Sequence, residues 1–308
     1  MNVSAKREQS HNLRVRADAI SAALPSLLVS ARRIAASVTL GSHGRRRAGV
    51  GDSFWQFRPY SKDDTPQAID WRQSGKFDTV FVREREWVAA QTAVLWCDTS
   101  PSMRYRSSAN LVTKAERAAI MMLAIAELLV DGGERVLRLD GQGRPQRAAT
   151  AGRIAVAQIA DAVAAELIST ERPEGAPAMP IFSAALPRHA SIVLFSDFLA
   201  PLEDIATSVR ALARQGIVGH LIQVLDPAEE TLPFSGRVRV VGLEAEGATV
   251  IDRAEEARTG YVSKLIAHRD GLKALATTAG WSFGLHHTDH SPLPAMAALH
   301  NAVTGFRR

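Results

Sequence analysis

Short apolar segments alternate with longer segments of helical spacing along most of this 308-residue chain, and this alternation constrains the fold more than any other feature. The short segments are rich in Val, Ile and Leu, which is typical of buried strands. Because a crossover between parallel strands usually contains a helix, the alternation predicts a parallel sheet covered by helices on both faces. The expected strands are 92–98, 135–141, 190–197, 218–226 and 281–288, and the expected helices are 113–133, 152–169, 201–216, 255–280 and 291–304.

The remaining segments predict smaller elements around this sheet. Residues 237–244 and 248–252 are expected to form an antiparallel pair at its edge, and residues 13–36 a helix that Pro25 kinks. Residues 54–88 mix aromatic and β-branched residues with charges, which predicts a β-rich extension docked on the main domain, with Trp71 largely buried. We therefore expect an N-terminal arm at 1–40, the extension at 41–90 and the main domain at 91–308.

Composition narrows the class of protein. Cys97 is the only cysteine, so the chain has no disulfide framework, and we expect a buried, inert thiol in a reducing compartment. We recognise neither a signal peptide nor a membrane-spanning run, and we expect a cytoplasmic protein. The net charge of +5 is uneven, because residues 1–50 carry +7 and the remainder −2. We interpret the basic arm as a solvated helix or a protein-docking segment with peripheral contacts, and expect no nucleic-acid partner.

Oxygen-bearing side chains follow the first expected strand of the sheet. In "VLWCDTSPSM" the strand ends at Asp98, and Ser100 and Ser102 follow at alternate positions. Asp197 ends another apolar strand, "SIVLFSD". Because ligand sites gather at the carboxyl ends of parallel strands, and hard cations prefer oxygen, these four residues predict a Mg²⁺ or Mn²⁺ site. The alternative is a capping motif, in which the hydroxyls satisfy backbone amides ahead of a helix.

The segment "DTSPS" after a buried strand resembles the metal-ion-dependent adhesion site of von Willebrand factor A-type domains. With the preceding sequence it resembles a conserved family of unknown function whose members accompany MoxR-type AAA+ ATPases. The likeness covers roughly residues 40–300, and it is carried by Arg58 and Tyr60, Asp63 and Asp64, Ile69-Asp70-Trp71, Val82-Arg83-Glu84, and Asp98 to Met103. It implies a von Willebrand factor A-like (Rossmann-type), doubly wound, mostly parallel sheet, preceded by a small β-rich extension and an N-terminal helix.

The chain departs from the family pattern at two places. Such sites take a third hydroxyl from a loop Thr between the two Asp-bearing strands, where this chain has Met179 and Pro180, with Ser183 as a substitute. Lys62 stands where the family has a glycine. The resemblance therefore implies a degenerate site, in which metal binding is weak, completed by a partner or lost.

The function that fits is recognition rather than catalysis. The resemblance implies a non-catalytic adaptor of a MoxR-type AAA+ ATPase, or of its client, which binds partner carboxylates through the metal. No nucleophile–base pair or phosphate loop is identifiable in the sequence. One alternative is a metal-dependent hydrolase or phosphotransferase using Asp98, Asp140 and Asp197; the other is a metal-free scaffold. We interpret "HHTDH" at 286–290 as a solvated strand end rather than a zinc site.

Overall fold

The structure is a computed structural model, and it describes residues 26–39, 54–61, 66–85, 91–146, 148–168, 179, 182, 186–187, 190–243 and 247–305. The chain forms two compact units, residues 43–90 and residues 1–42 together with 91–308. The first 25 residues of the predicted arm, the loop at 41–52, and Lys62, Asp63, Asp64, Pro180 and Ser183 lie outside the described residues.

The larger unit contains a sheet of five parallel strands in the order β4-β3-β5-β6-β9. Counted along the chain this order is 2-1-3-4-5, so the direction of winding reverses between β3 and β5. Two isolated antiparallel bridges lie beside β4: Thr150 pairs with Val136 in the strand, and Pro145 pairs with Leu139 directly after it. The predicted doubly wound α/β fold is therefore confirmed. The strands are β3 (Thr92–Cys97), β4 (Arg135–Arg138), β5 (Ser191–Ser196), β6 (Val218–Leu225) and β9 (Ser282–His287).

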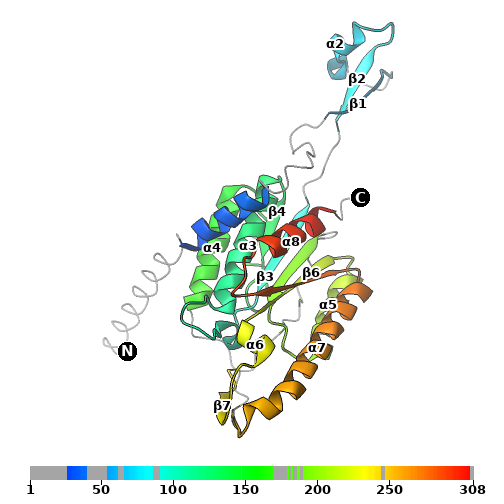
Figure 1. The fold of residues 1–308 in the computed structure, drawn as a ribbon. Helices are drawn as coiled ribbons and strands as arrows, with labels where there is room; N and C mark the ends of the chain where they lie inside the picture. The colour runs from blue at the N-terminus through cyan, green and yellow to red at the C-terminus, as the bar shows by residue number, and fades with distance from the viewer. Residues whose placement is uncertain are drawn as a thin grey trace, which may run out of the picture. The chain divides into compact units, whose positions relative to one another are not determined.

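Helices cover both faces of this sheet (Figure 1). One face packs against α3, α4, α8 and the helix at 26–39, and the other packs against α5 and α7. Residues 26–39 belong to the predicted N-terminal arm, and their apolar side chains lie in the core. The helices are α3 (Lys114–Asp131), α4 (Arg153–Ile168), α5 (Leu202–Arg214), α6 (Pro227–Thr231), α7 (Ala254–Thr278) and α8 (Leu293–Gly305).

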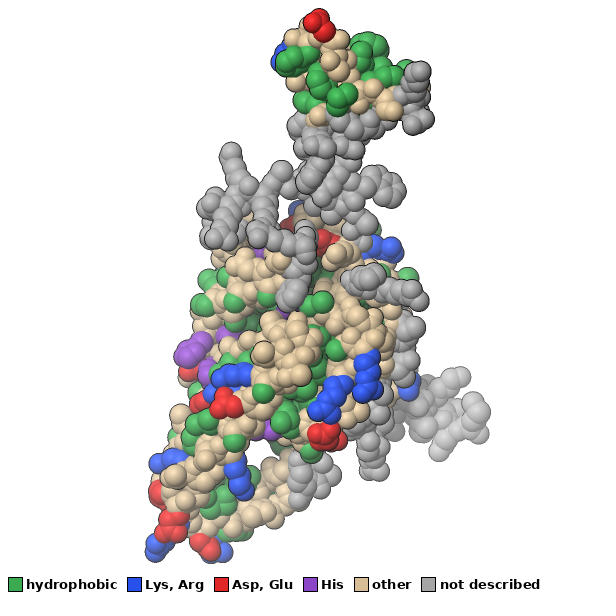
Figure 2. All heavy atoms as spheres, turned by 90° about the vertical axis from the view of Figure 1, so that its right-hand side faces the viewer, with side chains coloured by type: hydrophobic (Ala, Val, Ile, Leu, Met, Phe, Trp, Pro, Cys, Tyr) green, Lys and Arg blue, Asp and Glu red, His purple; other side chains and the backbone are tan. Residues whose placement is uncertain are grey.

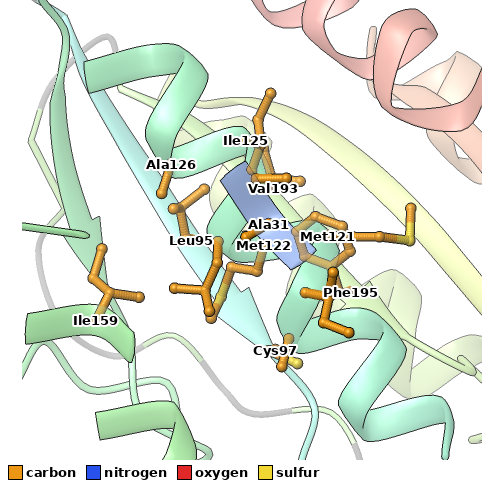
Figure 3. Close-up of a cluster of buried hydrophobic side chains, with 14 of the residues drawn as sticks. Ala31, Leu95, Cys97, Met121, Met122, Ile125, Ala126, Ile159, Val193 and Phe195 are labelled. Atoms are coloured by element: carbon orange, nitrogen blue, oxygen red, sulfur yellow. The ribbon is translucent and has the colours of Figure 1, made fainter. Parts of the chain in front are cut away.

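Alternate residues of the central strands fill the two layers of the core, as the pleat of a strand requires. Figure 3 shows the layer between the sheet and α3, where side chains of β3 and β5 meet those of the helix, among them Leu95, Cys97, Val193, Phe195, Met121, Met122 and Ile125. Cys97 is buried as predicted, and burial raises the pKa of its thiol far above the usual range. The thiol is therefore neutral and inaccessible.

The predicted edge pair does form, but it does not belong to the main sheet. β7 (Val238–Val241) and β8 (Ala248–Ile251) pair antiparallel as a separate two-stranded sheet. Val240, Val241 and Val250 are 43%, 57% and 48% exposed. A run of β-branched residues predicts a strand but does not specify the sheet that it joins, which explains the correction.

The smaller unit is a strand pair with a short helical connection, as predicted. β1 (Phe54–Pro59) pairs antiparallel with β2 (Phe81–Arg85), and η1 (Pro66–Ala68) and α2 (Trp71–Ser74) lie between them in the chain. The prediction that Trp71 is largely buried is wrong, because its side chain is 69% exposed. Asp70 caps α2 by accepting the Gln73 N–H at 2.9 Å, and an element with two strands and one helical turn has little apolar area to cover an indole.

Among the described residues, no helix is both long enough and apolar enough to cross a membrane. On the face shown in Figure 2, basic and acidic side chains are interspersed. The expectations of a cytoplasmic location and of no nucleic-acid partner stay predictions.

Candidate metal site

The two strand-end aspartates lie at the same edge of the sheet. Asp98 follows β3 directly, and its backbone N–H donates to the Phe195 carbonyl at 2.8 Å. Since Cys97 pairs with Phe195 in the parallel register, Asp98 is level with Ser196 and one residue from Asp197. Both aspartates are only 4% exposed. The winding of the sheet reverses between their strands, and ligands of doubly wound sheets bind at that switch point.

The Asp98 carboxylate is held by two neutral donors. Its Oδ1 accepts the Ser100 backbone N–H at 2.8 Å, and its Oδ2 accepts the Ser196 hydroxyl at 2.7 Å. Ser196 was not predicted as a site residue, although its hydroxyl directly precedes Asp197 at the end of a buried strand. These bonds hold both oxygens of Asp98 in fixed positions at the strand end.

Ser100 and Ser102 place two further oxygens beside Asp98. Ser100 is the residue before the short helix η2 (Pro101–Arg104), and its Oγ lies 3.0 Å from the Oγ of Ser102. An octahedral Mg²⁺ site with bonds of about 2.1 Å has neighbouring ligands about 3.0 Å apart. The two hydroxyls therefore have the separation that adjacent ligands of such an ion would have.

The charge of Asp197 affects the ionisation of Asp98. Burial, together with the negative charge of Asp197, raises the pKa of Asp98 to about 6, against the hydrogen bonds from Ser100 and Ser196, which lower it. Asp98 and Asp197 line a cavity of about 240 Å³ together with Ser102 and Met179. The four predicted site residues are thus brought together at one end of the sheet, whereas their role as metal ligands stays a prediction.

A buried lysine that the sequence reasoning missed lies against Asp197. The Lys114 ammonium is 2.9 Å from Asp197 Oδ2 and also forms an ion pair with Glu229 in α6. Burial opposes the charge of Lys114, but Asp197 and Glu229 outweigh it and raise its pKa. The available signal was a lysine in the first turn of a helix, where the helix dipole disfavours a cation, ahead of an apolar run from Ala118 to Ala126.

The residues fit a hard cation only in part. Ser100 and Ser102 supply hydroxyl oxygens at a suitable spacing beside Asp98, but Asp197 Oδ2 is already bonded to an ammonium group. Met179 is 5% exposed and lines the cavity, so a thioether stands where the pattern calls for a hydroxyl. Sulfur is a poor ligand for Mg²⁺. In the described part of the chain, no group of three or more His, Cys, Asp or Glu side chains is placed to hold a metal.

The residues of the competing interpretations have structural roles. Asp140 Oδ1 accepts the backbone N–H groups of Gln142 and Arg144, both at 2.9 Å, so it stabilises the turn after β4. The predicted solvated end at 286–290 needs a correction, because His286 is 3% exposed and burial lowers its pKa to about 4. His287 bonds to Glu230 at 3.1 Å, and only Asp289 and His290 are exposed.

A family model described as "Protein of unknown function DUF58" matches residues 56–271. Among solved structures, the chain is similar to the conserved hypothetical protein BatB from Bacteroides thetaiotaomicron, with 17% identity and a TM-score of 0.43 over 70% of this chain and 98% of that chain. It is also similar to an aerotolerance-related membrane protein from Bacteroides fragilis NCTC 9343 with multiple mutations to serines, with 19% identity and a TM-score of 0.39 over 70% of this chain and 100% of that one. No curated protein matches the chain.

Proposed function

Since this chain belongs to the DUF58 family, whose function is unknown, we propose its function from the site at the sheet edge. The protein is a non-catalytic interaction module that holds a carboxylate of a partner protein through a divalent cation, Mg²⁺ or Mn²⁺, at Asp98, Ser100 and Ser102. The partner is a MoxR-type AAA+ ATPase or a client of that ATPase. This choice of partner rests on the family resemblance of the "DTSPS" segment and of the sequence before it.

The observation that carries the proposal is the spacing of oxygens beside Asp98. Asp98 and the two serine hydroxyls come from one short segment, and the hydroxyls are 3.0 Å apart. Three ligands from one segment leave coordination positions of an octahedral ion open to an outside oxygen. Bound there, the cation would attract one more carboxylate strongly and make the interface metal-dependent.

The same geometry favours binding over catalysis. The hydroxyls of Ser100 and Ser102 lie within hydrogen-bond distance of each other, and among the described residues no histidine is hydrogen-bonded to either of them as a base. The cavity of about 240 Å³ is smaller than the roughly 300–1,000 Å³ of typical small-molecule sites. Asp140 would be needed by a two-metal hydrolase, but one of its carboxylate oxygens accepts the backbone N–H groups of Gln142 and Arg144 in the turn after β4.

A pull-down with the MoxR-type ATPase tests this function. The wild-type chain should capture the ATPase in Mg²⁺, and EDTA or Asp98→Asn should weaken capture by a factor of roughly 30 to 150, the equivalent of about 2–3 kcal/mol for one contact to a charged group. Asp161→Asn is the matched control, because Asp161 is exposed on α4. Circular dichroism would establish that both variants are folded.

The other results separate the alternatives. Capture that is unchanged by EDTA and by Asp98→Asn would leave a metal-free scaffold. Mg²⁺-dependent cleavage of phosphoesters that Asp98→Asn abolishes would show that the protein is an enzyme and that the proposed class is wrong.

A further inference from the structure

Lys114 occupies a position that is unfavourable without partners from elsewhere in the fold. It is the first residue of α3, and its side chain is completely buried. The N-terminal end of a helix carries partial positive charge, so a cation there is destabilising. A buried ammonium group also loses its hydration and is tolerated only when it is paired.

Two carboxylates provide that pairing, and one of them belongs to the candidate metal site. The Lys114 Nζ donates to Asp197 Oδ2 at 2.9 Å and to Glu229 Oε1 at 2.5 Å. Asp197 Oδ1 accepts the Leu199 backbone N–H at 3.2 Å. Both oxygens of Asp197 therefore already have a donor, and one of these donors carries a full positive charge.

Glu229 is itself fixed in place, so the lysine is held from two sides. Its Oε2 accepts the Asp226 backbone N–H at 2.9 Å, which forms part of the capping box of α6. The Lys114–Glu229 ion pair is thus a dipole whose positive end lies against Asp197. A divalent cation that used Asp197 would compete with the ammonium for the same oxygen and would be repelled by its charge.

We propose that Lys114 is the resident cation of Asp197, and that it keeps the affinity of this site for divalent cations low by withholding Asp197 as a ligand. Asp197 is thereby a charge-compensated structural residue in the wild-type chain, and a cation at Asp98 binds without it. The inference rests on the proposed function only in placing a cation beside Asp98. Met179, whose side chain offers no oxygen, is a second and independent reason for weak binding.

Titration calorimetry of the full chain with Mn²⁺ tests this inference. Lys114→Met/Glu229→Gln removes the dipole as a whole and leaves the summed formal charge of Asp98, Asp197, Glu229 and Lys114 unchanged. We expect this double variant to bind Mn²⁺ at least about tenfold more tightly than the wild type, because a like charge next to the ion is gone and Asp197 is free to ligate. Adding Asp98→Asn should abolish the gain.

Two controls distinguish this effect from a general change of charge. Glu229→Gln alone keeps the ammonium on Asp197 and should bind Mn²⁺ no more tightly than the wild type. Lys273→Met/Asp270→Asn removes an exposed ion pair of α7 and should leave Mn²⁺ binding unchanged. If Lys114→Met/Glu229→Gln does not fold, Lys114→Gln/Glu229→Gln keeps a hydrogen-bond donor beside Asp197 and should show the same gain.

A folded double variant that binds Mn²⁺ no more tightly than the wild type would overturn the inference. This result is independent of the proposed function, which fails when the ATPase is captured without metal or when turnover appears. Tight Mn²⁺ binding by the wild type, equal to that of the double variant, would also show that Lys114 does not limit the site.

Discussion

Removal of the Lys114 charge alone should destabilise the protein strongly. Lys114→Met leaves Asp197 and Glu229, whose side chains are 5% and 16% exposed, facing each other without a cation. Removing one partner of a buried ion pair costs roughly 3–5 kcal/mol, because the remaining charge stays buried and uncompensated. In a unit of this size 1 kcal/mol shifts the melting temperature by about 2–4 °C, so the expected loss is roughly 6–20 °C.

Urea denaturation followed by circular dichroism measures this loss as a lower transition midpoint at constant slope. Lys273→Met is the matched control, since it breaks the ion pair with Asp270, whose side chain is 64% exposed. An exposed pair contributes less than about 1 kcal/mol. Adding Glu229→Gln to Lys114→Met should restore part of the stability, because one uncompensated charge is removed. If Lys114→Met were as stable as Lys273→Met, the structural role assigned to the buried ion pairs would be refuted.

Two further predictions concern the packing of β6 and its neighbours. His220 is fully buried, and burial lowers its pKa to about 4, so below its usual pKa of 6.5 the unfolded chain binds a proton that the folded chain does not. The free energy of unfolding should therefore decrease as the pH falls from about 6.5 to 4, by up to about 1.4 kcal/mol per pH unit from this residue. In His220→Gln the midpoint of urea unfolding should fall less steeply with decreasing pH. An unchanged slope would contradict this prediction. Gly219→Ala would place a Cβ 2.2 Å from the Trp281 ring and should lower the free energy of unfolding by about 1–3 kcal/mol. Gly260→Ala, in α7 with nothing within 4 Å of the added Cβ, should stabilise the protein by up to about 1 kcal/mol. Equal melting temperatures of the two variants would show that Gly219 is not needed for this contact.

The elements of the main sheet and the place of the site could be predicted because both depend on local patterns. An apolar run followed by a helical period predicts a buried parallel strand wherever it occurs. Asp98 and Asp197 each follow such a run, and all carboxyl ends of a parallel sheet lie at one edge. No knowledge of distant contacts was needed to place these two residues near each other.

Predictions that depended on the surroundings of a residue failed more often. Trp71 is hydrophobic enough to be buried in most contexts, but in this unit it is 69% exposed. His286 appeared in a polar run and is nevertheless 3% exposed. Burial depends on which elements pack over a side chain, and the residue and its immediate neighbours do not contain that information.

By itself, therefore, the sequence determined the fold class, the family and the edge of the sheet where the oxygen-bearing side chains meet. Only the tertiary structure decided what lies next to Asp197. Lys114 is 83 residues from Asp197 and 115 residues from Glu229 along the chain, and the three residues meet because β5, α3 and α6 all have an end at the same edge. A buried charge is stable only when an opposite charge packs against it. Because the partners here are far apart in the sequence, the residues around each of them give no indication of the pairing.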